Sequence, residues 1–193
     1  MSVLERIEEH LAGWPGPFTA DDVFGTHDAA EIARDLERFC ARELGSSPRR
    51  ALFHEASVGC VFGVELEDGR RVVVKAHQQS ESEEHLSATS EVQRELARRG
   101  FPCPRPLLGP RPIGFAPATV EELVDRGARV EEYEQACGRT FSPAERVRLA
   151  AAAAYGLAYR GRCEACGDPA AREFPPGSVR KALALHGDDY LLL

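Results

Sequence analysis

The first 48 residues carry apolar positions at helical spacing in two segments. The second segment is the clearer one, because Asp28 followed by Glu31 forms a capping box and Gly45 ends the pattern. A proline- and glycine-rich link at 14–17 separates the two expected helices. The apolar positions are Val3, Leu4, Ile7 and Leu11 in the first helix, and Ile32, Leu36, Phe39, Cys40 and Leu44 in the second.

Residues 50–74 change to the pattern of a β-hairpin. Asp68-Gly69 marks its turn, and this dipeptide suits the positive φ angles of a type I′ turn. The second strand contains Val72-Val73-Val74 and ends in Lys75. A lysine at the end of a buried strand is costly unless an anion or a carboxylate meets it. The sequence therefore predicts a partner of negative charge for Lys75.

A third helix is expected from about Glu84 to Arg99, ended by Gly100 and a proline-rich exit. Glu91 and Glu95 lie on one edge of its apolar stripe, where either carboxylate could reach a strand packed beneath. The apolar stripe itself consists of His85, Ala88, Val92 and Leu96.

Two further elements follow the proline-rich exit. A strand is expected over 112–124, and a helix begins at Ser142-Pro143 and runs to about Gly161. The helix start is well marked, because Ser142 is a good N-cap, proline suits the first helical position, and Glu145 completes a capping box.

Composition narrows the class of protein. The chain has 193 residues, a formal net charge of −7, 43% hydrophobic residues and 28% charged residues. The negative charge argues against a nucleic-acid partner. No apolar run is long enough to span a bilayer, and the polar N-terminus does not read as a secretory signal. We expect a cytoplasmic protein with no membrane partner and with its six cysteines reduced.

Three segments taken together resemble the aminoglycoside phosphotransferase/choline-kinase-like family, which has a protein-kinase-like fold. They are SVGCVFGVELEDGRRVVVK, the helix leading to GFPCPRPL, and ATVEELVDRG, and the resemblance covers roughly residues 50–160. It implies an α+β fold in three parts. These are an N-terminal helical extension at 1–48, a kinase-like N-lobe of a small antiparallel sheet and one packed helix at 49–124, and a partial helical C-lobe at 125–193.

The resemblance also implies a site for ATP. Lys75 would bind the α- and β-phosphates, and Glu91 would orient it, with Glu95 as a competitor and with the family's usual glutamate aligning nearer Thr89. The loop Ser57-Val58-Gly59-Cys60 would cover the phosphates with backbone N–H groups. Gly59 has a second reading, the relief of crowding between strands. The backbone from Glu121 to Leu123 would form the hinge that binds adenine.

The C-terminal part of the family pattern is incomplete. The family writes HGDxHxxN, whereas His186-Gly187-Asp188 is followed by Leu193 at the asparagine position, where the chain ends. Asp188 is therefore either a catalytic aspartate in a truncated chain or part of an accidental tripeptide. Magnesium is expected for the family, but its ligands are not found, and no catalytic or metal-binding residue is assigned.

Other candidate chemistry is weaker. Cys163 and Cys166 form a single CxxC pair that reads as half of a zinc site or as a structurally incidental loop. His54 and His77 flank the hairpin and are expected on the surface.

The expected function is ATP-dependent phosphotransfer to a small hydroxylated molecule, with the truncated C-lobe leaving catalysis open. The alternative is a non-catalytic nucleotide-binding or interaction module. An incomplete C-lobe would leave an apolar helix face exposed, so self-association is also expected.

Overall fold

The computed structural model describes residues 1–12, 18–56, 59–101, 103–124, 134–135 and 138–148. The chain divides into two compact units, Met1–Ala136 and Cys137–Leu193. The first unit is an α+β assembly of helices and a five-stranded antiparallel sheet. The second unit is described over 138–148, where Ser142 caps a helix at 143–148 through the predicted bonds with Glu145.

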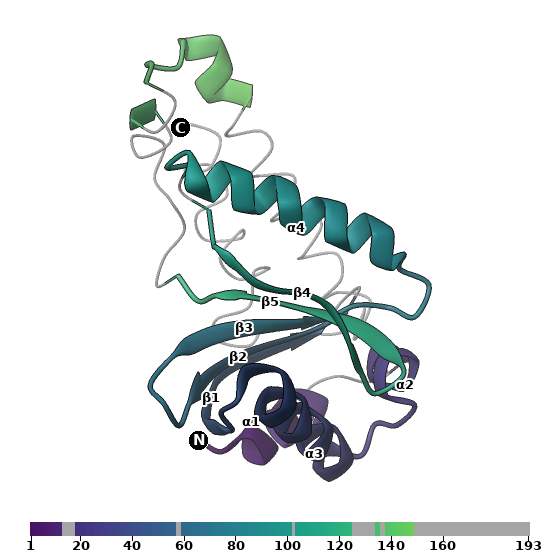
Figure 1. The fold of residues 1–193 in the computed structure, drawn as a ribbon. Helices are drawn as coiled ribbons and strands as arrows, with labels where there is room; N and C mark the ends of the chain where they lie inside the picture. The colour runs from purple at the N-terminus through teal and green to yellow at the C-terminus, as the bar shows by residue number, and fades with distance from the viewer. Residues whose placement is uncertain (13–17, 57–58, 102, 125–133, 136–137, 149–193) are drawn as a thin grey trace, which may run out of the picture. The chain divides into compact units, whose positions relative to one another are not determined.

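The sheet has the strand order β1-β2-β3-β5-β4. Its strands are β1 (Pro48–Ala56), β2 (Cys60–Leu66), β3 (Arg71–Ala76), β4 (Pro106–Ile113) and β5 (Ala116–Glu122). The first three strands follow one another in space as they do in the chain. The connection from β3 contains helix α4 (Glu83–Arg98) and leads to the far edge, and β5 then returns to pair with β3. The chain therefore places β3 in the middle of the sheet (Figure 1).

Strand β4 is an element that the sequence did not predict. The expected strand over 112–124 is β5 with its preceding turn, whereas the segment before it reads as a proline-rich exit. β4 contains Pro106, Pro110 and Pro112, yet it pairs with β5. Proline is tolerated there because β4 is an edge strand, so one side of its backbone has no ladder to complete.

The turn between β2 and β3 lies at the predicted position but has a different geometry. Gly69 has φ +86°, and no residue other than glycine has a positive φ among those described, so Asp68 does not fit a type I′ turn. Gly69 N donates to Leu66 O at 3.0 Å and Leu66 N donates to Arg70 O at 2.8 Å. This is a three-residue loop with a glycine bulge.

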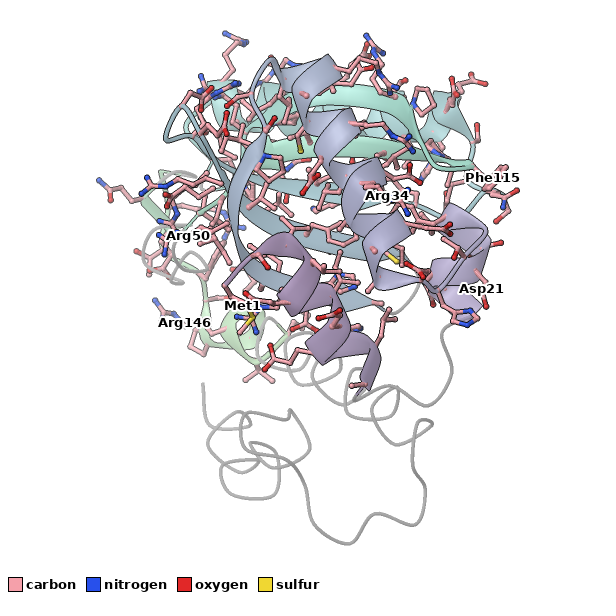
Figure 2. All side chains as sticks on the ribbon, turned by 90° about the horizontal axis from the view of Figure 1, so that it is seen from below. Met1, Asp21, Arg34, Arg50, Phe115 and Arg146 are labelled. Carbon is pink, nitrogen blue, oxygen red and sulfur yellow. The ribbon has the colours of Figure 1, made fainter. Side chains whose placement is uncertain are left out.

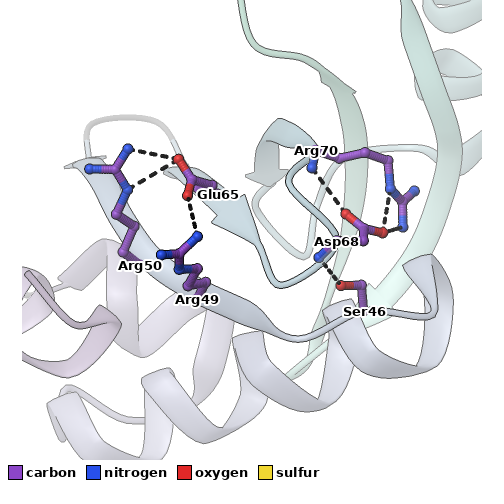
Figure 3. Close-up of polar contacts among 6 residues, drawn as sticks. All are labelled: Ser46, Arg49, Arg50, Glu65, Asp68 and Arg70. Atoms are coloured by element: carbon purple, nitrogen blue, oxygen red, sulfur yellow. Dashed lines mark hydrogen bonds and ion pairs between the residues drawn. The ribbon is translucent and has the colours of Figure 1, made fainter.

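Polar side chains stabilise this turn and join strand β2 to strand β1 (Figure 3). Asp68 accepts from Arg70 N at 3.0 Å and from Arg70 Nε at 2.7 Å. On β2, Glu65 forms ion pairs with Arg50 at 2.7 Å and with Arg49 at 3.5 Å, which tie β1 to β2. These pairs are exposed on the arginine side, so each contributes little to stability.

Helices α1 (Val3–Ala12), α2 (Phe18–Phe24) and α3 (Ala29–Phe39) form the N-terminal part, and α3 continues as a π-helical turn, η1 (Cys40–Leu44). Asp28 caps α3 as predicted, because its side chain accepts from Ala30 N and Glu31 N. Gly45, with φ +70°, ends the π turn. The sequence predicted α1 and α3 and missed α2, which follows the proline-rich link.

One face of the sheet packs against these N-terminal helices. Phe62 on β2 and Val74 on β3 are buried in one cluster with Ile7 of α1 and Leu36 of α3. Figure 2 shows the helices of this face in front of the sheet, and Arg34 of α3 is exposed to solvent. The residues expected to be an extension therefore share a single hydrophobic core with the sheet.

Helix α4 lies over the opposite face of the sheet (Figure 1). Its bounds agree with the prediction, but the predicted apolar stripe was wrong. His85 and Ala88 are exposed, and Val92 and Leu96 are 62% and 39% exposed. Leu86 and Ser90 are the buried residues instead. The helix is rotated so that the 86, 90 and 93 positions face the sheet.

Histidines join α1 to β1 in the core, contrary to the expected surface position of His54. His54 is 7% exposed and stacks on Phe62, with ring centroids 4.4 Å apart and an interplanar angle of 2°. The ring of His10 also lies near that of His54, with ring centroids 4.4 Å apart and the two planes tilted by 58°. Burial lowers the pKa of His54 to about 3, with nearby His10 adding to the effect, and burial also lowers the pKa of His10.

Within the described residues, no helix has both the length and the apolar character needed to cross a bilayer.

We predict that His54 makes the first unit sensitive to acid. The pKa of His54 is about 3 in the folded chain, whereas an unfolded histidine titrates near 6.5. The unfolded state therefore binds the extra proton between these values, and stability rises with pH from about 3 to about 6.5. His54→Phe keeps a ring against Phe62 and should reduce that slope by about 1.4 kcal/mol per pH unit near pH 5.

Urea denaturation at a series of pH values, with hydrogen exchange of the β2 amides as the reporter, measures this slope. The stability at pH 7.5 serves as the control, because the unfolded histidine is neutral there. An unchanged slope in His54→Phe would show that His54 takes up its proton without unfolding.

Candidate functional site

The predicted lysine lies on the middle strand of the sheet, on the face that α4 covers. Val72, Val74 and Ala76 of β3 point into the core beneath the sheet, so strand alternation places Val73 and Lys75 on the other face. β3 is bordered by β2 and β5 along its length, which fixes the backbone of Lys75 on both sides. The charged side chain of Lys75 therefore projects from a backbone that is held in place on both sides.

The carboxylate that meets Lys75 comes from strand β5. Lys75 Nζ lies 2.6 Å from Oε1 of Glu121. Glu121 is 8% exposed, whereas the side chain of Lys75 is 39% exposed. The pair therefore has a buried anionic end and a cationic end that solvent or a ligand can reach. Both side chains share a face because Lys75 is paired with Thr119, two residues from Glu121.

Helix α4 contributes an amide to the same group. Gln93 Nε2 donates to Glu121 Oε2 at 3.1 Å and to Pro104 O at 2.8 Å. The thiol of Cys103 donates to Gln93 O at 3.7 Å. Burial raises the pKa of the Cys103 thiol, and the Glu121 carboxylate adds to that shift. Gln93 therefore ties the helix to the ion pair on the sheet.

A histidine completes the polar group at the end of β3. His77 Nε2 lies 3.0 Å from Thr119 Oγ1, and His77 N donates to Pro117 O at 2.9 Å. Burial lowers the pKa of His77, and nearby Lys75 lowers it further, against the opposing effects of Glu81 and Glu121. His77 is half-buried, so it lies closer to the expected surface position than His54 does.

Glu91 does not occupy the predicted position beside Lys75. It lies on the outer side of α4, where it lines a hollow with Val92, Glu95, Leu96 and Arg99. Glu95 pairs with Arg98 and Arg99 at 2.8 and 2.7 Å. The physical reason is the phase of the helix, since Ser90 and Gln93 face the sheet and Glu91 is turned about 100° from Ser90.

The structure describes only the second half of the loop that was expected to cover the phosphates. Ser57 and Val58 lie outside the described residues, whereas Gly59 and Cys60 lie within them. A Cβ atom on Gly59 would come within 2.5 Å of Ala76 O, so a close approach of backbone requires glycine there. Cys60 begins β2 and its side chain is in the core, where burial raises its pKa to about 12.

The expected hinge forms the end of β5 and the residue after it. Glu122 N donates to Arg105 O at 2.9 Å, and Leu123 N donates to Arg71 O at 3.1 Å. Both N–H groups thus extend the sheet ladders. A nucleobase held at Glu121–Leu123 would have to use other backbone groups than these two donors.

The remaining candidates cannot be placed. Asp188, Cys163 and Cys166 lie outside the described residues, as do residues 149–161 of the helix that the sequence predicts. Within the described part of the chain, no group of three or more His, Cys, Asp or Glu side chains could hold a metal ion.

Sequence reasoning missed Gln93, Thr119 and His77 as members of this site, and it assigned Glu121 to the hinge and not to Lys75. One sequence pattern nevertheless pointed to two of these residues. In Ala118-Thr119-Val120-Glu121 the apolar residues alternate with polar ones, which places Thr119 and Glu121 on the face opposite the core. The positions of Gln93 and His77 depend on the packing of α4 and on the strand register, and no local pattern reveals them.

Comparison of the sequence with protein-family models gives no match, and no curated protein matches it either. The function is therefore inferred from the geometry of the described residues.

We predict that Lys75 and Glu121 are energetically coupled. Lys75→Met leaves a buried carboxylate without its cation and should lower the free energy of unfolding by about 1–2 kcal/mol, a value reduced by the partial exposure of Lys75. Adding Glu121→Gln should restore most of the loss. Hydrogen exchange of the β3 and β5 amides in urea measures the double-mutant cycle.

Arg94→Met removes an exposed cation from α4 and provides the matched control. Additive effects of Lys75→Met and Glu121→Gln would contradict the coupling.

Proposed function

We propose that residues 1–124 form the nucleotide-binding lobe of a kinase-type phosphotransferase and that Lys75 binds the phosphates of ATP. The observation that carries this proposal is the position of Lys75. It lies on the third strand of an antiparallel sheet, and the helix after that strand packs over the face from which the lysine projects. Kinase-type enzymes place their phosphate-binding lysine on the third strand, followed by such a helix.

The electrostatics of the site support an anionic ligand. The ammonium group of Lys75 is the part of the ion pair that remains partly exposed, and its strand is held by ladders on both sides. A cation on a backbone that is already fixed can bind a phosphate as a point charge, and binding then orders only the lysine side chain. A nucleoside triphosphate with magnesium is the ligand that we propose, with a small hydroxylated molecule as the acceptor.

Lys75 differs in one respect from the family arrangement. The carboxylate beside it belongs to Glu121 of β5, whereas the helix offers the neutral amide of Gln93. This difference favours a second candidate, a nucleotide-binding module without phosphotransfer, and only turnover separates it from the enzyme.

Nucleotide binding is tested by thermal denaturation. With millimolar ATP and magnesium, we expect the melting temperature of the whole chain to rise by about 3–5 °C, because a ligand that binds the folded state stabilises it by mass action. Lys75→Met should remove most of this ligand-induced rise. Arg94→Met, which removes a cation elsewhere on the same lobe, should retain it.

The difference between melting with and without ligand is compared within each variant, so the intrinsic stability of the variant cancels. An equal rise in wild-type protein and in Lys75→Met would contradict the proposed role of Lys75. No rise in either protein would contradict nucleotide binding altogether. Product formation from a panel of hydroxylated amines and sugars would distinguish the enzyme from the module.

A further inference from the structure

The cation that we propose for phosphate binding already has an anionic partner. Oε1 of Glu121 lies 2.6 Å from Lys75 Nζ, within direct ion-pair distance. A phosphate that binds Lys75 must therefore come close to the Glu121 carboxylate or displace it. The phosphate and the Glu121 carboxylate carry like charges and would repel each other, and the repulsion is greater near a buried carboxylate than in water.

Glu121 is held in its position by helix α4. The amide nitrogen of Gln93 has two hydrogens, and both have acceptors, since one is donated to Pro104 O and the other to Glu121 Oε2. Oε2 is thus fixed by the helix, and Oε1 is left facing Lys75. To turn away from Lys75, the carboxylate would have to give up the bond with Gln93 or carry the helix with it.

We propose that Glu121 competes with the phosphates of the ligand for Lys75. This inference rests on the proposed nucleotide-binding function and concerns the regulation of the same site. The Glu121 carboxylate weakens the affinity of Lys75 for anionic ligands. Through Gln93, displacement of Glu121 is coupled to the position of α4.

A different role for Glu121 predicts the opposite result. If the carboxylate chiefly orders the lysine side chain, its removal would release Lys75 into several rotamers and weaken binding. If the carboxylate chiefly competes, its removal would strengthen binding by the lost repulsion. The direction of the change in affinity therefore decides between positioning and competition.

The experiment is isothermal titration of the full chain and of Glu121→Gln with three probes: ATP with magnesium, tripolyphosphate with magnesium, and adenosine. Glutamine has the same shape and still accepts a hydrogen bond from Gln93. We expect affinities for ATP and tripolyphosphate that are about five- to tenfold higher in Glu121→Gln, and an unchanged affinity for adenosine. The gain should shrink at high salt.

Two variants control for other causes. The double variant Lys75→Met/Glu121→Gln should not show the higher affinity of Glu121→Gln, because the competition acts through Lys75. Glu67→Gln removes one exposed negative charge from the β2–β3 turn and should leave the affinities as in wild-type protein. If Glu121→Gln fails to fold, Glu121→Met removes the same charge at similar length and is expected to give the same gain.

The outcomes separate the two proposals. Wild-type binding that depends on Lys75, together with weaker or equal binding in Glu121→Gln, would overturn the competition and leave the nucleotide site standing. An equal gain in Glu67→Gln would overturn it as well, because total charge would then explain the change. No binding of ATP by any variant would overturn the nucleotide-binding function, and the competition with it.

Discussion

The alternation of strand β3 is the constraint on which the site depends. Val72, Val74 and Ala76 are buried in the core shared with the N-terminal helices, so Lys75 can only project from the other face. A shift of register by one residue would put the lysine in the core and three apolar residues in the site, at a cost of several kcal/mol. The large apolar face thus fixes the position of one charge, and pairing with β5 then fixes the position of Glu121 beside it.

The polar group above the sheet is small, and its members depend on one another. Lys75, Glu121 and Gln93 come from two strands and a helix, and each satisfies a group that would be costly to bury alone. Such a network contributes less to net stability than apolar residues of equal volume would. The hydrogen bond from Gln93 to Glu121 links this network to α4, a helix that otherwise contacts the sheet mainly at β4.

Local sequence signals predicted where helices and turns lie, but they did not predict which side chains these elements bring into contact. Asp28 caps α3 as expected, although its backbone N donates to Thr26 and not to Glu31 as in a full capping box. The capping box at Ser142 forms as expected, and the β2–β3 turn lies at Asp68-Gly69. The phase of α4 was wrong because Val92 and Leu96 suggested an apolar stripe, whereas tertiary packing buries Leu86 and Ser90. β4 was missed because its prolines argue against a strand until its edge position is known. The partner of Lys75 could not be predicted, since it is set by pairing between strands more than 40 residues apart in the sequence.

The packing of helices α1, α2 and α3 on one face of the sheet has a practical consequence for the isolation of the first unit. Its smallest autonomous folding unit begins at α1 and not at β1, because a fragment that starts near Pro48 would present Phe62, Val64, Val72 and Val74 to water. Such a fragment would expose one apolar face of the sheet to water and would therefore tend to self-associate. The N-terminal helices thus cover the apolar face of the strands that follow them in the sequence and keep it from aggregating.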